Sequence, residues 1–319
     1  MLPFVLRRLA LSVPLCLGIS IIIFCLAHSL PGGPLAMYMN TSTITAGQLQ
    51  HVSAQLGLDR PLYLQYLDWL TRALHGDFGR SFSDGRPALA VIWDRIPATA
   101  ELMVCAFAIS VFLAIGLGVL SALRYRKLAD RVVTMVSYAG ISMPVFWLGI
   151  IAILLFGVQL RLLPIAGIGT PGQPFSVLDN LRHLALPALV LAGYTAAQQC
   201  RYVRSSVLDV LGAPFVQTAR SKGLSERVVI LKHVLRNALI PVVTVFALDA
   251  AHLLSGALIT ETVFAWPGMG RLFYDSLHAG DYPVVIGIAL MASAMVILFN
   301  LLADVLYVVI DRRVQIAWA

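Results

Sequence analysis

Residues 212–241 read GAPFVQTARSKGLSERVVILKHVLRNALIP. Pro214 suits the first turn of a helix, and Gly223 stands where a glycine would end that helix in a left-handed conformation. Ser225 can then cap a second helix. The stretch therefore predicts a helix, a glycine turn and another helix. We call this feature, residues 209–237, the elbow.

Both predicted helices of the elbow carry an apolar side. The apolar residues are Phe215, Val216 and Ala219 in the first helix, and Val228, Leu231 and Leu235 in the second. Basic residues lie between them, so the elbow should rest across a membrane face. Pro241 is where we expect the following membrane span to begin.

The segments on both sides of the elbow are long and apolar. The chain is 59% hydrophobic and only 12% charged, whereas soluble domains carry about a quarter charged residues. Its mean hydropathy is +0.84. Roughly 20 apolar residues are enough to cross a bilayer as a helix. The sequence therefore predicts an all-α membrane protein with six spans: 9–30, 102–123, 132–159, 184–199, 239–264 and 284–310.

The first span is longer than the apolar part of a secretory signal, which favours an uncleaved anchor. Lys and Arg gather in alternate segments, so the positive-inside rule predicts that both termini are cytoplasmic. This placement also accounts for the net charge of +7 without a nucleic-acid partner. Arg201 and Arg204, at the end of the fourth span, are interpreted as snorkelling anchors. The basic segments predicted to be inside contain Arg7, Arg8, Arg124, Arg126, Lys127, Arg131, Arg220, Lys222, Arg227, Lys232, Arg236, Arg312 and Arg313.

Residues 31–97 are predicted to form an external loop with short amphipathic helices. Helical spacing is found in two groups: Leu49, Val52 and Leu56, then Leu62, Tyr66, Trp69 and Ala73. The loop is short for an independent core, which favours a packed cap over a separate binding domain. We therefore expect one transmembrane domain over 1–319, with a five-span core over 98–311.

Small residues recur every four positions in the second span: Ala106, Ser110, Ala114, Gly118 and Ala122. Such a stripe lets another helix backbone approach closely in lipid. Asn300 and Asp304, one turn apart in the last span, are also interpreted as helix-packing residues.

Three ionisable residues fall in or beside the fifth span. Asp249 and His252 lie one turn apart near its middle, and Glu261 begins the outer turn. One interpretation is that they line a translocation pathway, where they would contact a charged substrate or metal. The other is that Asp249 and His252 form a hydrogen-bonded pair that locks helices together.

The motifs of several enzyme classes are absent from the sequence. It contains no GxxxxGK[ST], HExxH or GxSxG, and its four cysteines form no CxxC. We therefore predict a non-catalytic chain with no catalytic residue, no metal site and no cofactor of its own.

The elbow resembles the EAA loop of binding-protein-dependent ABC importer permeases, with Gln217, Thr218 and Ala219 at the positions of Glu-Ala-Ala. Ordered matches over almost the whole chain are similar to the dipeptide/oligopeptide/nickel permease family. The chain departs from the family's pattern at Gln217-Thr218 and at Arg312, where proline often follows the aspartate. The matching segments are 96–102, 142–144, 146–147, 219–224, 236–241, 261–270, 281–283 and 300–304, with Tyr307 and Asp311.

The resemblance implies a type I ABC importer transmembrane domain in the bacterial cytoplasmic (inner) membrane. It implies a second homologous permease subunit, two cytosolic ATPase subunits that bind ATP and Mg, and an external solute-binding protein. Di- or oligopeptides are the first substrate hypothesis, and nickel or another small solute is the alternative. A secondary transporter or channel is the alternative from another class. The implied ATPase-coupling residues are Phe215, Gln217, Thr218, Ala219, Arg220, Lys222 and Gly223.

Overall fold

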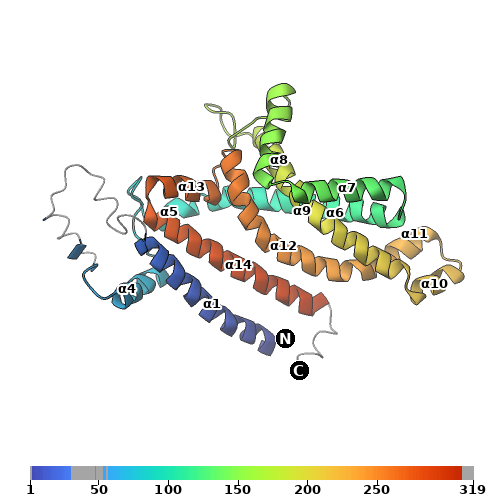
Figure 1. Ribbon diagram of the computed structural model, residues 1–319, viewed down its shortest axis with the longest axis horizontal. Helices are drawn as coiled ribbons and strands as arrows, with labels where there is room; N and C mark the ends of the chain where they lie inside the picture. The colour runs from blue at the N-terminus through green and yellow to red at the C-terminus, as the bar shows by residue number, and fades with distance from the viewer. Residues whose placement is uncertain (1, 30–46, 48–52, 55–56, 311–319) are drawn as a thin grey trace. The chain divides into compact units, whose positions relative to one another are not determined.

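The protein is built from helices (Figure 1). The computed structural model describes residues 2–29, 47, 53–54 and 57–310, without the side chains of 2–6, 27, 251–252, 255–256 and 306–310. Within these residues the only β-type pairing is one antiparallel bridge between Arg80 and Pro87. The all-α prediction is confirmed.

The chain divides into two compact units. The first unit comprises Met1–Val5, Ala100–Trp266 and Leu298–Ala319, and the second comprises Leu6–Thr99 and Pro267–Ile297. The elbow belongs to the first unit, and the described part of the predicted external loop belongs to the second.

The first unit is organised around α9 (Val177–Leu211), α12 (Arg236–Val263) and most of α6 (Ile96–Leu123). Its buried core consists of alanine and valine residues, including Val203, Val207 and Val242, together with Phe246. The remaining elements are α7 (Leu128–Ser142), α8 (Val145–Ala152), the π-helical η2 (Ile153–Gln159), α10 (Pro214–Ser221), α11 (Glu226–Val228), the π-helical η3 (Val229–Leu235) and the end of α14 (Tyr282–Ile310).

The small-residue stripe of α6 lies in this core. Ala106, Ser110 and Ala114 are fully buried. A Cβ added to Gly118 would lie only 2.7 Å from the Val203 side chain. Glycine is needed here because α9 passes too close to α6 for any side chain.

The predicted span 132–159 is not one straight helix. α7 and α8 meet at a bend of 106°. The break lies at Met143, which is extended with φ −95° and ψ 132°, because a following proline disfavours the helical conformation. Pro144 then starts α8.

Four helices within the described residues are long and apolar enough to cross a membrane, or five if the bent pair forms one span. α9 is not among them. It runs unbroken for 35 residues through Pro187, but His183 and Gln198-Gln199 bound its apolar middle. The four spans are Arg7–Leu26, Ala88–Leu123, Glu226–Ala250 and Tyr282–Val305, and the bent pair is Leu128–Ser142 with Val145–Gln159.

The second unit contains α1 (Leu2–Ser29) from Leu6 onward, α4 (Leu62–Leu74), α5 (Ala88–Trp93), α13 (Met269–Ala279) and the start of α14. The helix predicted from Leu62 to Ala73 is confirmed as α4, whereas Leu49, Val52 and Leu56 lie outside the described residues. α4 rests on α1 through the hydrogen bond between Ser20 Oγ and Tyr66 Oη, 2.8 Å long.

The loop between α4 and α5 is fastened to the start of α14. Asp281 is 1% exposed. Its Oδ2 accepts hydrogen bonds from the Ser81 hydroxyl and, at 3.2 Å, from the Ser83 N–H. Ile92 and Val284 pack nearby in the unit's apolar core, so polar and apolar contacts both hold this loop.

Candidate functional site

The elbow begins with α10, a helix of eight residues. Pro214 occupies the first turn, after Ala213 in an extended conformation, so its missing N–H costs no hydrogen bond. Inside the helix, Thr218 Oγ1 donates to the Pro214 carbonyl oxygen at 3.0 Å. This bond keeps the Thr218 side chain close to its own helix.

α10 ends in the predicted glycine turn. Gly223 has φ +75°, a conformation that a Cβ penalises, and its N–H donates to the Arg220 carbonyl oxygen at 2.9 Å. A Cβ built on Gly223 would meet no atom within 4 Å. The turn therefore needs glycine because of its backbone conformation, and not because a side chain would clash with a neighbour.

An ion pair crosses the turn. The Arg220 guanidinium donates to both oxygens of Glu226, at 2.7 and 3.2 Å. Because these bonds favour the charged form, they raise the pKa of Arg220 above its ordinary value. Both side chains are about half exposed, so solvent screens the pair and it adds little to stability.

The underside of α10 is embedded in the first unit. Val216 is fully buried and Ala219 is 5% exposed, in the core that also holds Val229 and Val234. The prediction that Phe215 shares this apolar side is wrong: Phe215 is 45% exposed. It precedes Val216 by one position, which turns its side chain about 100° around the helix.

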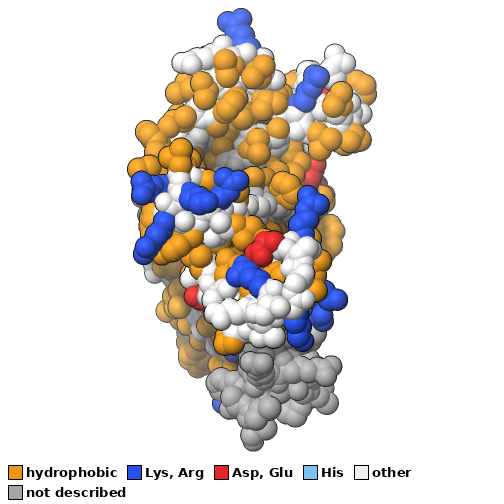
Figure 2. Space-filling model, turned by 90° about the vertical axis from the view of Figure 1, so that its right-hand side faces the viewer, with side chains coloured by type: hydrophobic (Ala, Val, Ile, Leu, Met, Phe, Trp, Pro, Cys, Tyr) orange, Lys and Arg blue, Asp and Glu red, His pale blue; other side chains and the backbone are white. Residues whose placement is uncertain are grey.

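The opposite side of the elbow is exposed. Gln217, Thr218, Arg220, Lys222 and Gly223 are all accessible in this chain. Figure 2 shows the face of the first unit that carries α10, where Lys and Arg side chains outnumber Asp and Glu. The elbow thus presents a basic surface that also carries exposed apolar side chains, namely Phe215, Leu224, Val228 and Leu231. The predicted apolar side of the second helix is therefore not buried at Val228 and Leu231, and Val229 and Val234 are buried instead.

The second half of the elbow continues without a break into α12. The backbone is helical at Val228 and Leu235, the two junctions around η3. No helix begins at Pro241, where we expect the following span to begin, because Pro241 lies inside α12. Ser225 occupies the N-cap position as predicted, but its side chain makes no cap hydrogen bond. Movement of the elbow would act directly on the helix that carries Asp249.

A buried acid holds the helices next to the elbow. Asp130 is 4% exposed and accepts hydrogen bonds from Ser121 Oγ at 2.5 Å and the Arg126 N–H at 2.8 Å. Arg204 donates to both of its oxygens, at 2.7 and 3.0 Å. The interpretation of Arg204 as a snorkelling anchor is wrong, because this bidentate pair joins α7 to α9. Sequence reasoning missed Asp130, although it is the only acid between Glu101 and Asp179.

Two of the three predicted pathway residues, Asp249 and Glu261, lie far apart on α12. Asp249 is partly buried on α12, and Glu261 is fully buried twelve residues later, about 18 Å further along the helix. The side chain of His252 lies outside the described residues. Asn300 is exposed and Asp304 is partly buried on α14. Within the described residues no three His, Cys, Asp or Glu side chains are grouped to hold a metal ion.

Comparison with known proteins identifies the family. Residues 114–316 match the family described as "Binding-protein-dependent transport system inner membrane component", and residues 1–103 match its N-terminal companion. The chain is 39% identical to the oligopeptide transport system permease protein AppB of Bacillus subtilis, with 99% of this chain and 100% of that protein covered.

A second relative is the dipeptide transport system permease protein DppB of Escherichia coli K12, at 39% identity with 99% of each chain covered. A chain from the crystal structure of an amino acid ABC transporter with histidines has the same fold. It aligns with a TM-score of 0.51 at 15% identity, over 68% of this chain and 93% of that chain. The family matches and the two full-length relatives agree with the helical membrane fold described above. The chain belongs to the inner membrane components of binding-protein-dependent transport systems.

Proposed function

We propose that this chain is the permease subunit of an ATP-driven importer for di- or oligopeptides, and that its elbow couples ATP hydrolysis to transport. The observation that carries the coupling role is the contrast within α10. Val216 and Ala219 are buried, whereas Gln217, Thr218 and Lys222 are exposed beside them. A short helix that is buried on one side and polar and exposed on the other suits docking of a cytosolic partner. The substrates in the names of the two relatives favour peptides over nickel.

In this proposal the chain is one permease domain over 1–319, with six spans, both termini in the cytoplasm and residence in the bacterial cytoplasmic membrane. It forms half of the translocation pathway and pairs with a second homologous permease. Two cytosolic ATPases, which bind ATP and Mg, dock on the elbows, and an external solute-binding protein delivers the peptide. No catalytic step falls to this chain. Closure of the ATPases would push the elbow, and the continuous helix from Glu226 would transmit the push into the membrane.

Purification of the tagged chain in mild detergent tests the assembly. We expect a second permease and P-loop ATPases to co-elute, and the complex to hydrolyse ATP faster when loaded solute-binding protein and peptide are added. A stable homo-oligomer with no ATPase, in preparations that retain other ABC complexes, would contradict the proposal and favour a secondary transporter.

Gly223→Val tests the coupling role. Valine is strained at φ +75°, so the turn should change its direction. We expect peptide uptake to fall to background while membrane insertion and the amount of protein stay unchanged. Uptake into proteoliposomes and stimulated ATPase activity are the measurements.

Two other variants serve as controls for that experiment. Gly223→Asn should keep most of the uptake, because asparagine tolerates the left-handed conformation. Gly212→Val should transport normally, because Gly212 has φ −82° and its nearest neighbour to an added Cβ is 3.9 Å away. Normal uptake by Gly223→Val would refute the coupling role.

A further inference from the structure

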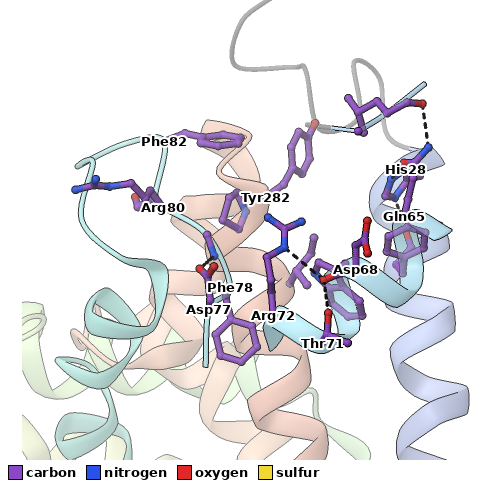
Figure 3. A pocket seen from close by; sticks show the side chains of 18 of the residues that line it. His28, Gln65, Asp68, Thr71, Arg72, Asp77, Phe78, Arg80, Phe82 and Tyr282 are labelled. Carbon is purple, nitrogen blue, oxygen red and sulfur yellow. Dashed lines mark hydrogen bonds between the residues drawn. The ribbon is translucent and has the colours of Figure 1, made fainter. Parts of the chain in front are cut away.

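The second unit contains a cavity of about 860 Å³, a size typical of sites for small molecules. Its walls come from the end of α1, the residues before α4 (Ala54, Gly57, Leu58 and Arg60), α4 itself, the loop after α4, and the first turn of α14 (Figure 3). This unit includes the segment that we place outside the membrane. The function proposed above assigns no role to this cavity.

Two arginines that line the cavity have no carboxylate partner. Arg60 pairs with Asp68 at 3.1 Å, whereas Arg72 and Arg80 form no ion pair among the residues that the structure describes. Arg72 Nε donates only to the Asp68 carbonyl oxygen, at a long 3.4 Å. Its guanidinium rises between Tyr282 and Asp68 in Figure 3. The fork of Arg72 is thus available to a carboxylate ligand.

Aromatic rings line the same cavity as this guanidinium. Trp69 lines the cavity from α4, Phe78 from the following loop and Tyr282 from the start of α14. These rings offer apolar area to a ligand with little loss of side-chain entropy. Among the described residues, the cavity therefore combines several aromatic rings with two arginines that form no ion pair.

Acidic groups add an opposite charge to the same cavity. Asp77 lines it and uses Oδ1 to accept the Gly79 N–H at 3.0 Å. Behind the wall, Asp281 is bonded to Ser81, and its Oδ1 is buried without a hydrogen-bond partner in the described part of the chain. The cavity can therefore receive a molecule that carries both charges.

We propose that this cavity is a binding site for short peptides on the permease itself, in which Arg72 binds the free C-terminal carboxylate. The aromatic rings hold the side chains of the peptide, and Asp77 faces its ammonium end. This inference rests on the proposed peptide transport and adds a site where the permease selects its substrate. A free peptide suits the cavity because one small molecule supplies the carboxylate, the ammonium and the apolar body.

The test uses the purified permease complex without its solute-binding protein. Binding of the dipeptide Ala-Phe and of its C-terminal amide is measured by calorimetry at pH 7. We expect the amide to bind about tenfold more weakly than the free acid, because it lacks the charged acceptor. We expect Arg72→Gln to weaken binding of the acid by a similar factor, and to leave the amide unaffected.

Arg86→Gln is the matched control. Arg86 lies in the same loop region and pairs with Asp84 and Asp94, but it does not line the cavity, so its loss should leave binding unchanged. The amide comparison uses the unmodified protein, so it stands even if Arg72→Gln fails to fold. No binding of Ala-Phe, or equal binding of acid and amide, would overturn the proposal, and so would an equal loss in Arg86→Gln. If the binding test fails, uptake of peptide by the full complex from the same preparation distinguishes the two proposals. Uptake that is still observed would show that only this inference has failed, whereas absence of uptake would refute the proposed function.

Discussion

The two units each contain a buried acid that fastens a loop. Asp130 in the first unit and Asp281 in the second are 4% and 1% exposed. Each accepts a serine hydroxyl and a backbone N–H, from Ser121 and Arg126 for the former and from Ser81 and Ser83 for the latter. Only Asp130 also has a cation, Arg204, on both of its oxygens.

The presence of a cation at Asp130 but not, among the described residues, at Asp281 shows that a buried carboxylate can fasten a loop in two ways. At Asp130 the negative charge is itself part of the contact, because it holds Arg204 of α9 against α7. At Asp281 the described contacts need only an acceptor oxygen, and one oxygen remains without a hydrogen-bond partner. An asparagine keeps an acceptor but loses the charge, so one substitution at both positions measures what the charge contributes.

Asp130→Asn should produce the largest effect. It breaks a bidentate pair whose Asp side chain is 6% exposed, which leaves Arg204 partly buried without its counter-charge. We expect the free energy of unfolding in detergent to fall by about 3 kcal/mol. Exposed Arg131→Gln is the control and should change it by less than about 0.5 kcal/mol. A loss below about 1 kcal/mol would mean that the charge is dispensable at Asp130 as well.

Asp281→Asn should be much milder. Its amide oxygen can still accept from Ser81 and Ser83, so we expect less than about 1 kcal/mol of lost stability, measured in the same way. Asp281→Ala should cost about 2 kcal/mol, because it leaves the buried Ser81 hydroxyl and the Ser83 N–H without their acceptor. Equal losses for the Asn and Ala variants would show that the charge of Asp281 matters, and the contrast with Asp130 would fail.

The elbow could be predicted from the sequence because its signals are local. Pro214 and Gly223 each act through the conformation of their own backbone, and the structure has both where the sequence placed them. The exposure of Phe215 was missed because an apolar side chain carries no mark of which side of a short helix is buried. The continuity of α12 through Pro241 was missed because a proline inside a helix is a tertiary outcome.

The Asp130 contacts could not be predicted from spacing. Their donors come from three places in the chain, at Ser121, Arg126 and Arg204, and only the folded helices bring them together. The cavity in the second unit is also a long-range feature, since Arg72 and Tyr282 are more than two hundred residues apart. The sequence offered one sign of the Asp130 contacts, because Asp130 is a single acidic residue within a basic segment. The cavity has no comparable sign in the sequence.

The smallest predicted effect concerns a third acid, which is less buried than the other two. Asp179, in the first turn of α9, accepts the Thr170 N–H at 2.6 Å and the Thr170 hydroxyl at 2.9 Å. The hydrogen bond from the Thr170 N–H holds the pKa of Asp179 below its ordinary value. A carboxyl group with a lowered pKa in the folded state stabilises the protein above its unfolded pKa of about 4, and this contribution is lost as the pH falls through the folded pKa.

Asp179→Asn should therefore lower the Tm slightly at pH 7 and pH 5, and the difference from the unmodified protein should shrink below about pH 4. The measurement is thermal unfolding of both proteins in one detergent over that pH range. A difference that persisted undiminished at pH 3 would show that Asp179 acts through its shape and not its charge. Asp179 would then resemble Asp281, whose contacts need only an acceptor oxygen, and not Asp130, whose contacts need the negative charge.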